Sequence, residues 1–136
     1  MAKYSAYGTV LMKGATPIVQ ITNISGPGLS LDTEDVTTHD STEAWEEVVA
    51  TILRSGEVSF DIVYDPAAAT HKNDTGGLLY DYASRTANTY SIVFSDTGTT
   101  TWEFSAFVTG FEPSAPVDGA LTASCKMKIN GKPTLV

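Results

Sequence analysis

Residues 121–130 read LTASCKMKIN and alternate apolar with polar side chains along their whole length. Successive side chains of a β-strand point to opposite faces, so Cys125 and Met127 would share an apolar face while Lys126 and Lys128 face the other way. Residues 57–64, EVSFDIVY, alternate in the same manner. Strands with one apolar and one polar face are typical of antiparallel sheets with one buried face. These two segments therefore predict two strands of an antiparallel β-sheet.

Two more strands are predicted at residues 89–95 and 101–112, where aromatic and small apolar side chains alternate with polar ones. Residues 74–87 place apolar side chains at helical spacing, with Asp74 or Thr75 as the N-cap, which predicts an α-helix. Many alternating strands with one helix predict a mainly β (α+β) fold, an antiparallel β-sandwich or partial barrel with one flanking α-helix. The length of 136 residues suits a single domain, residues 1–136.

The first part of the chain has weaker signals. Residues 1–17 mix small, polar and a few apolar side chains, which favours an N-terminal arm or a weakly held first strand. Residues 18–24 are rich in β-branched side chains, and Gly26-Pro27-Gly28 marks a turn before residues 29–36. This pattern predicts a β-hairpin formed by the two segments.

The segment from residue 37 to residue 56 has two interpretations. Its apolar residues fall at helical spacing: Trp45, Val48, Val49, Ile52 and Leu53. One interpretation is a short amphipathic helix that packs on the core of its own domain. The other is a protruding loop whose apolar residues contact another subunit.

Composition excludes several classes of protein. No stretch approaches the roughly 20 consecutive apolar residues that a membrane-spanning helix needs, and the first residues lack the apolar centre of a signal peptide. The formal net charge of -8 argues against affinity for nucleic acid, because phosphate binding depends on clustered lysine and arginine. We therefore expect a protein that is made in the cytoplasm, does not enter a membrane and does not attract DNA.

The residues that usually carry chemistry are few and scattered. Cys125 is the single cysteine and lies on the apolar face of its strand, which favours a buried, inert thiol. His39 and His71 are isolated from other metal ligands and favour surface or turn positions. The acidic residues lack the order of a calcium loop, and no phosphate-binding loop or dinucleotide fingerprint occurs. The sequence predicts no enzymatic activity, no metal site and no cofactor.

Several motifs, taken in order, resemble the major tail tube proteins of long-tailed, non-contractile bacteriophages, the group that includes the phage lambda tube protein. The resemblance covers nearly the whole chain. It is carried by DVTTHDS at residues 35–41, SGEVSF at 55–60, YDP at 64–66, NTYSIVF at 88–94, WEFSAFVTGF at 102–111 and KMKINGKP at 126–133. It implies a structural virion protein, made in the bacterial host cytoplasm, that assembles into stacked hexameric rings forming the hollow tail tube.

The resemblance also implies partners and contact residues. The partners are other copies of the chain, tape-measure, tail-terminator and distal tail proteins, and DNA that passes through the lumen without specific binding. Residues 37–56 would be the long inter-subunit loop, with contacts from Trp45, Glu46, Glu47, Val48, Val49, Ile52 and Leu53. The natural arms would be residues 1–17, with Tyr4 and Tyr7, and residues 131–136, with Lys132 and Pro133.

A ring that closes a continuous sheet would turn one face of its strands toward a channel. Acidic side chains there would let DNA slide past without sticking. The candidates for the lumen lining are Asp32, Glu34, Glu57, Asp61 and Glu103. The alternative is that these are ordinary solvent-facing strand positions.

Two other functions are weighed against the phage tube. A hexameric tube subunit of a type VI secretion-like or contractile system would share the fold. A monomeric carbohydrate-binding module would display exposed aromatic side chains. Most aromatic residues here lie on apolar strand faces, which leaves Trp45 as the main exposed candidate and disfavours the binding module.

Overall fold

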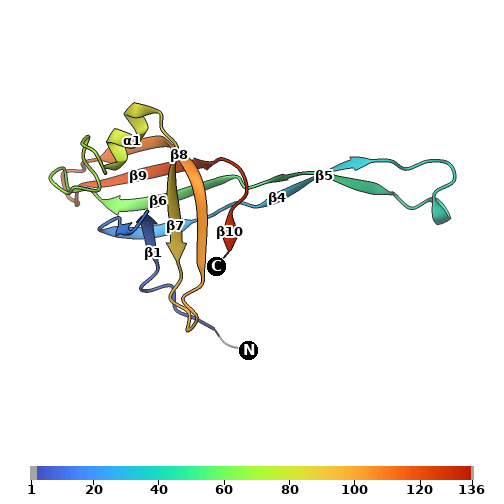
Figure 1. The fold of residues 1–136 in the computed structure, drawn as a ribbon, viewed down its shortest axis with the longest axis horizontal. Coiled ribbons are helices and arrows are strands. Elements are labelled where there is room, and N and C mark those ends of the chain that lie inside the picture. The colour runs from blue at the N-terminus through green and yellow to red at the C-terminus, as the bar shows by residue number, and fades with distance from the viewer. Residues whose placement is uncertain (1–2, 136) are drawn as a thin grey trace.

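The computed structural model describes residues 3–135, which form a β-sheet body and one long hairpin that projects from it (Figure 1). The strands β4 and β5 form the projecting hairpin, residues 30–54, and a short 3-10 helix, Thr42–Ala44, lies at its tip. The elements of the body are β1 (Val10–Lys13), β2 (Thr16–Pro17), β3 (Ile21–Ser25), β6 (Glu57–Val63), α1 (Leu78–Ser84), β7 (Asn88–Val93), β8 (Thr101–Ser114), β9 (Thr122–Ile129) and β10 (Thr134–Leu135). Those of the hairpin are β4 (Ser30–Asp35) and β5 (Val48–Arg54). The mainly β fold with a flanking helix is confirmed.

The body is one bent antiparallel sheet in the order β2-β1-β7-β8-β9-β6-β3, with β10 paired to β8. The long strand β8 joins its two halves. Residues Thr101–Ala106 pair with β7, and residues Ala106–Ser114 pair with β9 across a register shift between Val108 and Gly110. In Figure 1, β1 and β7 run across the direction of β6 and β9. The sheet thereby folds over a shared core without closing into a barrel.

The core is formed by alternate residues of the strands that the sequence pattern predicts. Phe60 of β6 lies opposite Cys125 of β9, and Val58 lies opposite Met127, all on the buried face. Fully burying one large aliphatic or aromatic side chain contributes about 1.5–3 kcal/mol, so this face stabilises the body. The buried apolar residues are Leu11, Ile18, Val58, Phe60, Ile62, Leu78, Tyr90, Ile92, Phe104, Ala106, Val108, Ala123, Cys125, Met127 and Ile129.

The helix is shorter than predicted. α1 begins at Leu78 with Gly77 as its N-cap, not Asp74 or Thr75, and ends where Arg85 takes a left-handed conformation (φ 56°). Leu78 of the predicted apolar side is buried, but the other buried residue of the helix is Asp81, which has partners inside the body. Within residues 3–135 no helix has the length and apolar character to cross a membrane.

His71 lies in a turn of the loop between β6 and α1, but it is fully buried rather than on the surface. The Asp65 backbone N–H donates to Nδ1 at 3.2 Å, and Nε2 lies 2.8 Å from the Val19 carbonyl oxygen. A neutral ring with its proton on Nε2 satisfies both contacts. The side chain therefore ties this loop to the segment before β3.

The predicted hairpin between residues 18–24 and 29–36 is wrong. β3 pairs with β6 and β4 pairs with β5, so the two segments do not pair with each other. Gly26 and Gly28 do lie in a break of the chain, as expected, but this break interrupts a longer ribbon that continues from the body into the projecting hairpin. Local sequence marks the break correctly but does not show which strands become neighbours.

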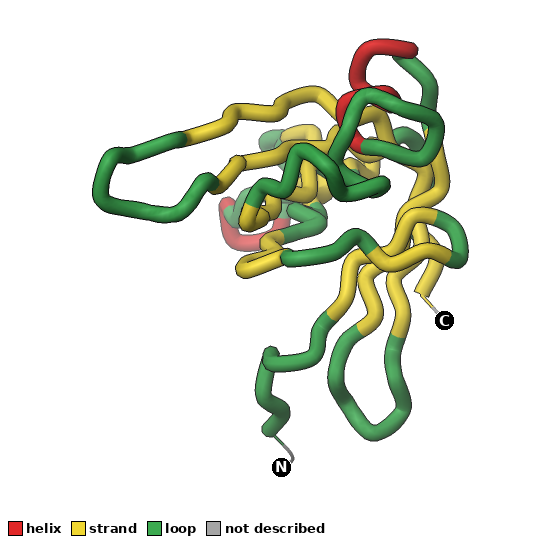
Figure 2. Tube along the Cα trace, turned by 90° about the vertical axis from the view of Figure 1, so that its left-hand side faces the viewer, coloured by secondary structure: helices red, strands yellow, loops and turns green. Residues whose placement is uncertain are grey.

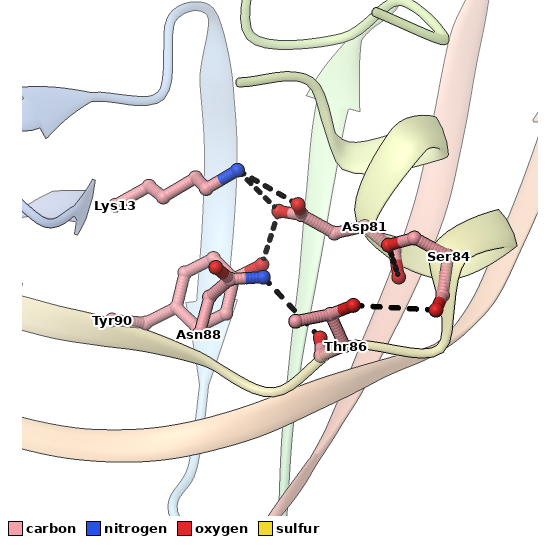
Figure 3. Close-up of polar contacts among 6 residues, drawn as sticks. All are labelled: Lys13, Asp81, Ser84, Thr86, Asn88 and Tyr90. Atoms are coloured by element: carbon pink, nitrogen blue, oxygen red, sulfur yellow. Dashed lines mark hydrogen bonds and ion pairs between the residues drawn. The ribbon is translucent and has the colours of Figure 1, made fainter. Parts of the chain in front are cut away.

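Part of the predicted N-terminal arm belongs to the body. Leu11 of β1 is fully buried, and β1 pairs with β7. Lys13 Nζ lies 2.7 and 2.8 Å from the two carboxylate oxygens of Asp81, which is only 3% exposed, and the Tyr90 hydroxyl donates to Asp81 Oδ2 at 2.7 Å (Figure 3). Burial, followed by the contact with Asp81, raises the pKa of the Tyr90 phenol. This cluster fastens β1 to α1 and β7.

Candidate assembly surfaces

The hairpin, which projects from the body in Figure 1, exposes large apolar side chains along its whole length. Every residue of β5 is exposed, and within the described chain β4 and β5 pair only with each other. Leu53 is 81% exposed and Trp45 is 71% exposed. A two-stranded hairpin is at best marginally stable alone in water. The apolar side chains of the hairpin are therefore not covered by any other element of the described chain.

A β-bulge explains why these residues resemble a helix in sequence. Leu31 pairs with Leu53 and Thr33 pairs with Ala50, so Thr51 and Ile52 together oppose one residue of β4. The extra residue changes the local period of the strand and places Val49 and Ile52 on the same face. Their spacing of three mimics one turn of a helix. The helical interpretation of residues 37–56 is wrong, and the protruding segment is a β-hairpin.

Polar contacts hold the hairpin in shape. Arg54 Nε lies 2.7 Å from Asp32 Oδ2, and the Thr51 hydroxyl donates to the Asp32 carbonyl oxygen at 3.1 Å. Toward the tip, the Glu47 backbone N–H donates to the Thr37 hydroxyl oxygen at 2.8 Å. The hydrogen bond from the Thr37 side chain lowers the pKa of Asp35. These exposed contacts order the hairpin without covering its apolar residues.

The hairpin also concentrates the negative charge of the chain. Residues 30–54 contain seven of the 16 acidic residues and one of the eight basic residues, a formal net charge of -6, which leaves -2 for the rest. Two hairpins brought together would repel each other. The charge therefore disfavours a second hairpin as the partner surface.

Glycines allow a close crossing of the chain at the base of the hairpin. Gly56 has φ +70°, and a Cβ there would lie 2.4 Å from the Gly28 carbonyl oxygen. Gly26 has φ +110°, and a Cβ there would lie 2.5 Å from the Glu57 carbonyl oxygen. Any larger residue would be strained and would push these backbones apart. Both glycines thus set the direction in which the hairpin leaves the body.

The five acidic lumen candidates do not gather at one place. Asp32 and Glu34 lie on the projecting hairpin, and Asp32 is paired with Arg54. Glu57 and Asp61 lie on the polar face of β6, while Glu103 lies on β8. The face formed by β6 and β9 is mixed in charge, because Glu57 is in register with Lys128 and Ser59 with Lys126.

The two termini occupy different parts of the body. Tyr4 and Tyr7 are exposed and, with the turn between β7 and β8, line a groove of about 680 Å³ whose walls include Ile21 and Phe94. Figure 2 shows the N-terminal segment beside this turn. Lys132 and Pro133 precede β10, which pairs with β8 next to Trp102, so the predicted C-terminal arm is partly a strand of the body.

Two exposed apolar residues of the hairpin, Leu31 and Val36, are absent from the predicted contacts. Leu31 is half exposed and lies directly opposite Leu53. The sequence pattern places both residues in a strand that pairs with residues 18–24, and the signal that could separate them is the acidic run between them, Asp32 to Asp35. Within residues 3–135 no three metal-ligating side chains cluster, and burial raises the pKa of the Cys125 thiol to about 12.

Comparison with known proteins identifies the family. The family described as lambda phage tail tube protein matches residues 4–136. A comparison with curated protein sequences gave no significant match.

Among the solved structures that match, three share the fold over almost the full length of both chains. The sheath/tube terminator of an extracellular contractile injection system (PVC) has a TM-score of 0.76 at 13% identity, covering 100% of this chain and 98% of that one.

The second is the virion of a native gene transfer agent, with a TM-score of 0.76 at 13% identity and coverage of 98% and 99%. The third is the baseplate of the anti-feeding prophage, with a TM-score of 0.70 at 11% identity and coverage of 100% and 97%. The fold is thus shared with contractile systems, and the family model that matches this chain is that of the lambda phage tail tube protein. The chain belongs to the lambda phage tail tube protein family, and it is a structural virion protein of the tail tube rather than an enzyme.

Proposed function

We propose that copies of this chain form hexameric rings that stack into a hollow tube, and that the projecting hairpin makes the contacts between subunits. The observation that carries the proposal is the row of exposed apolar residues on a hairpin that no other element of the described chain covers. Exposed apolar patches of this kind mark interaction sites, and unpaired strand edges invite pairing unless they are covered. Assembly would supply the missing cover.

The contact residues are those of the hairpin tip and β5: Trp45, Glu46, Glu47, Val48, Val49, Ile52 and Leu53. The termini, with Tyr4, Tyr7, Lys132 and Pro133, are further contact candidates. The ends of the tube would meet tail-terminator and distal tail proteins, and the lumen would hold a tape-measure protein before DNA passes. Two of the similar structures, a tube terminator and a baseplate, support partners at both ends.

The double variant Trp45→Ala with Ile52→Ser is expected to stay a folded monomer that forms no tubes. Both side chains are exposed, so the body keeps its core, while loss of a central contact residue, Trp above all, costs about 2 kcal/mol or more of binding free energy. Circular dichroism checks the fold, and light scattering with negative-stain microscopy checks assembly. Val117→Ser, an exposed apolar position outside the hairpin, is the matched control and should assemble. Normal tubes from the double variant would show that the hairpin is not the contact.

We further propose that the polar face of β6 and β9 lines the lumen, with Glu57 and Asp61 offsetting Lys126 and Lys128. These four side chains leave that face without net charge, so DNA is not attracted to it. Glu103 would extend the lining along β8, whereas Asp32 and Glu34 belong to the hairpin, which pairs with neither β6 nor β9.

Reversing Glu57 and Asp61 to Lys is expected to permit assembly but to lower infectivity at constant particle number. The change removes two negative charges and adds two positive charges per subunit on the proposed lining, a net change of +4, which lets phosphates bind there. Asp74→Lys with Asp118→Lys makes the same change in charge on exposed loops and should leave infectivity near that of the wild type. Equal infectivity of both double variants would remove β6 from the lumen.

A further inference from the structure

We propose that the assembled tube covers the projecting hairpin on both of its faces, each face by a different copy of this chain. The inference rests on the proposed role of the hairpin as the contact between subunits. It adds that each hairpin forms the middle layer between two neighbours rather than lying on the surface of one.

The strand register places apolar residues on both faces of the hairpin. Leu31 pairs with Leu53, so these two share one face, and Val48, paired with Asp35, lies on the same face because residues 31 and 35 of a regular strand point the same way. Val49 pairs with Glu34, which points to the opposite face. Ile52 lies in the bulge opposite Asp32, directly before Leu53, and therefore shares the face of Val49. All five apolar side chains are at least 47% exposed.

The solvent-facing side of β6 and β9 serves as a comparison for the two faces of the hairpin. The outward face of β6 carries Glu57, Ser59 and Asp61, and that of β9 carries Lys126 and Lys128. Val63, the last residue of β6, is the one large aliphatic residue that these two strands place on this face, and it is half-buried. The hairpin has large aliphatic residues on both faces, so a partner on one face alone would leave the other in contact with water.

Geometry requires two separate covers. The two faces of a strand ribbon look in opposite directions, and a surface packed on either face lies about 10 Å from the ribbon. A tube subunit is surrounded by copies of itself, so the covers are two other copies. The charge of -6 on each hairpin disfavours contact between hairpins more than contact with a body, whose charge is -2, so we assign both covers to the bodies of those copies.

Two double variants separate the faces. Val49→Thr with Ile52→Thr changes one face, and Val48→Thr with Leu53→Thr changes the other. Threonine is β-branched, which favours a strand, and all four positions are exposed, so both variants should fold like the wild type by circular dichroism. Each is expected to raise the protein concentration needed for assembly by at least about tenfold. Val117→Thr is the control and should leave that concentration unchanged.

The outcomes distinguish this inference from the proposed function. If one double variant assembles at the wild-type concentration, that face is uncovered and the inference is wrong, while the hairpin contact itself stands. If both assemble at the wild-type concentration, the proposed function of the hairpin also fails. A benzoylphenylalanine cross-linker at position 49 or at position 53 gives a second measurement. Cross-links from the two positions should map to different body peptides, and a shared peptide or a peptide within residues 30–54 would contradict the proposal.

Discussion

Asp81→Ala is expected to lower the free energy of unfolding by about 3–5 kcal/mol, and the thermal midpoint by about 10–20 °C. The carboxylate is 3% exposed and accepts hydrogen bonds from Lys13 Nζ and the Tyr90 hydroxyl. Its removal leaves two groups without their partner: the ammonium of Lys13, whose side chain is only 19% exposed, and the hydroxyl of the fully buried Tyr90. Leaving a buried charge uncompensated costs more than the pair itself contributes. Urea unfolding followed by circular dichroism measures the loss.

A triple variant tests whether this loss of stability comes from the polar groups that Asp81→Ala leaves unpaired. Lys13→Met, Asp81→Leu and Tyr90→Phe together remove every polar end of the cluster, and apolar replacement of a buried ion pair is often neutral. This variant should be more stable than Asp81→Ala, although it changes more residues. A loss below about 1 kcal/mol for Asp81→Ala would show that water reaches the pair in solution. Because the pair holds β1, the variant should also loosen the N-terminal segment beside the β7–β8 turn.

The strands with strict alternation were predictable, because a hydrophobic period of two residues indicates directly which side chains face the core. The segments predicted at residues 57–64 and 121–130 correspond to β6 (Glu57–Val63) and β9 (Thr122–Ile129), with the predicted residues buried. The pairing of β3 with β6 was not predictable. Residues near Ile24 and Phe60 are in register across a long separation in the chain, and a local pattern contains no information about which edge a strand will meet.

The projecting hairpin shows a second limit of sequence patterns. A bulge at Thr51 and Ile52 breaks the period of two, so the apolar residues follow a spacing that fits a helix as well as a bulged strand. Asp81 shows a third limit. A charged residue in a short helix is expected to face water, and its burial depends on Lys13, which lies 68 residues away in the chain. The protruding character of the segment was nevertheless one of the two interpretations.

Cys125 is expected to make the folded protein less stable as the pH rises above about 9. Burial, followed by the charge of Asp61, raises the pKa of the thiol from 9.0 to about 12 in the folded state. Above pH 9 the unfolded chain loses this proton while the folded chain keeps it, so the unfolded state gains stability until the pH passes about 12. Each pH unit in this window is worth about 1.4 kcal/mol, which gives a loss of roughly 2–3 kcal/mol by pH 11.

Comparison of the wild type with Cys125→Ala isolates this contribution. The variant loses some stability at pH 7, because it leaves a small cavity opposite Phe60. All other titrating groups are common to both chains, the Tyr90 phenol among them, so the difference between their free energies of unfolding reports the thiol. The stability advantage of the wild type over the variant should fall by roughly 2–3 kcal/mol between pH 8 and pH 11, and it can change sign. Urea titrations under reducing conditions measure this change. Parallel curves would mean that the thiol ionises as readily in the folded protein as in the unfolded chain, and that water reaches the core between β6 and β9.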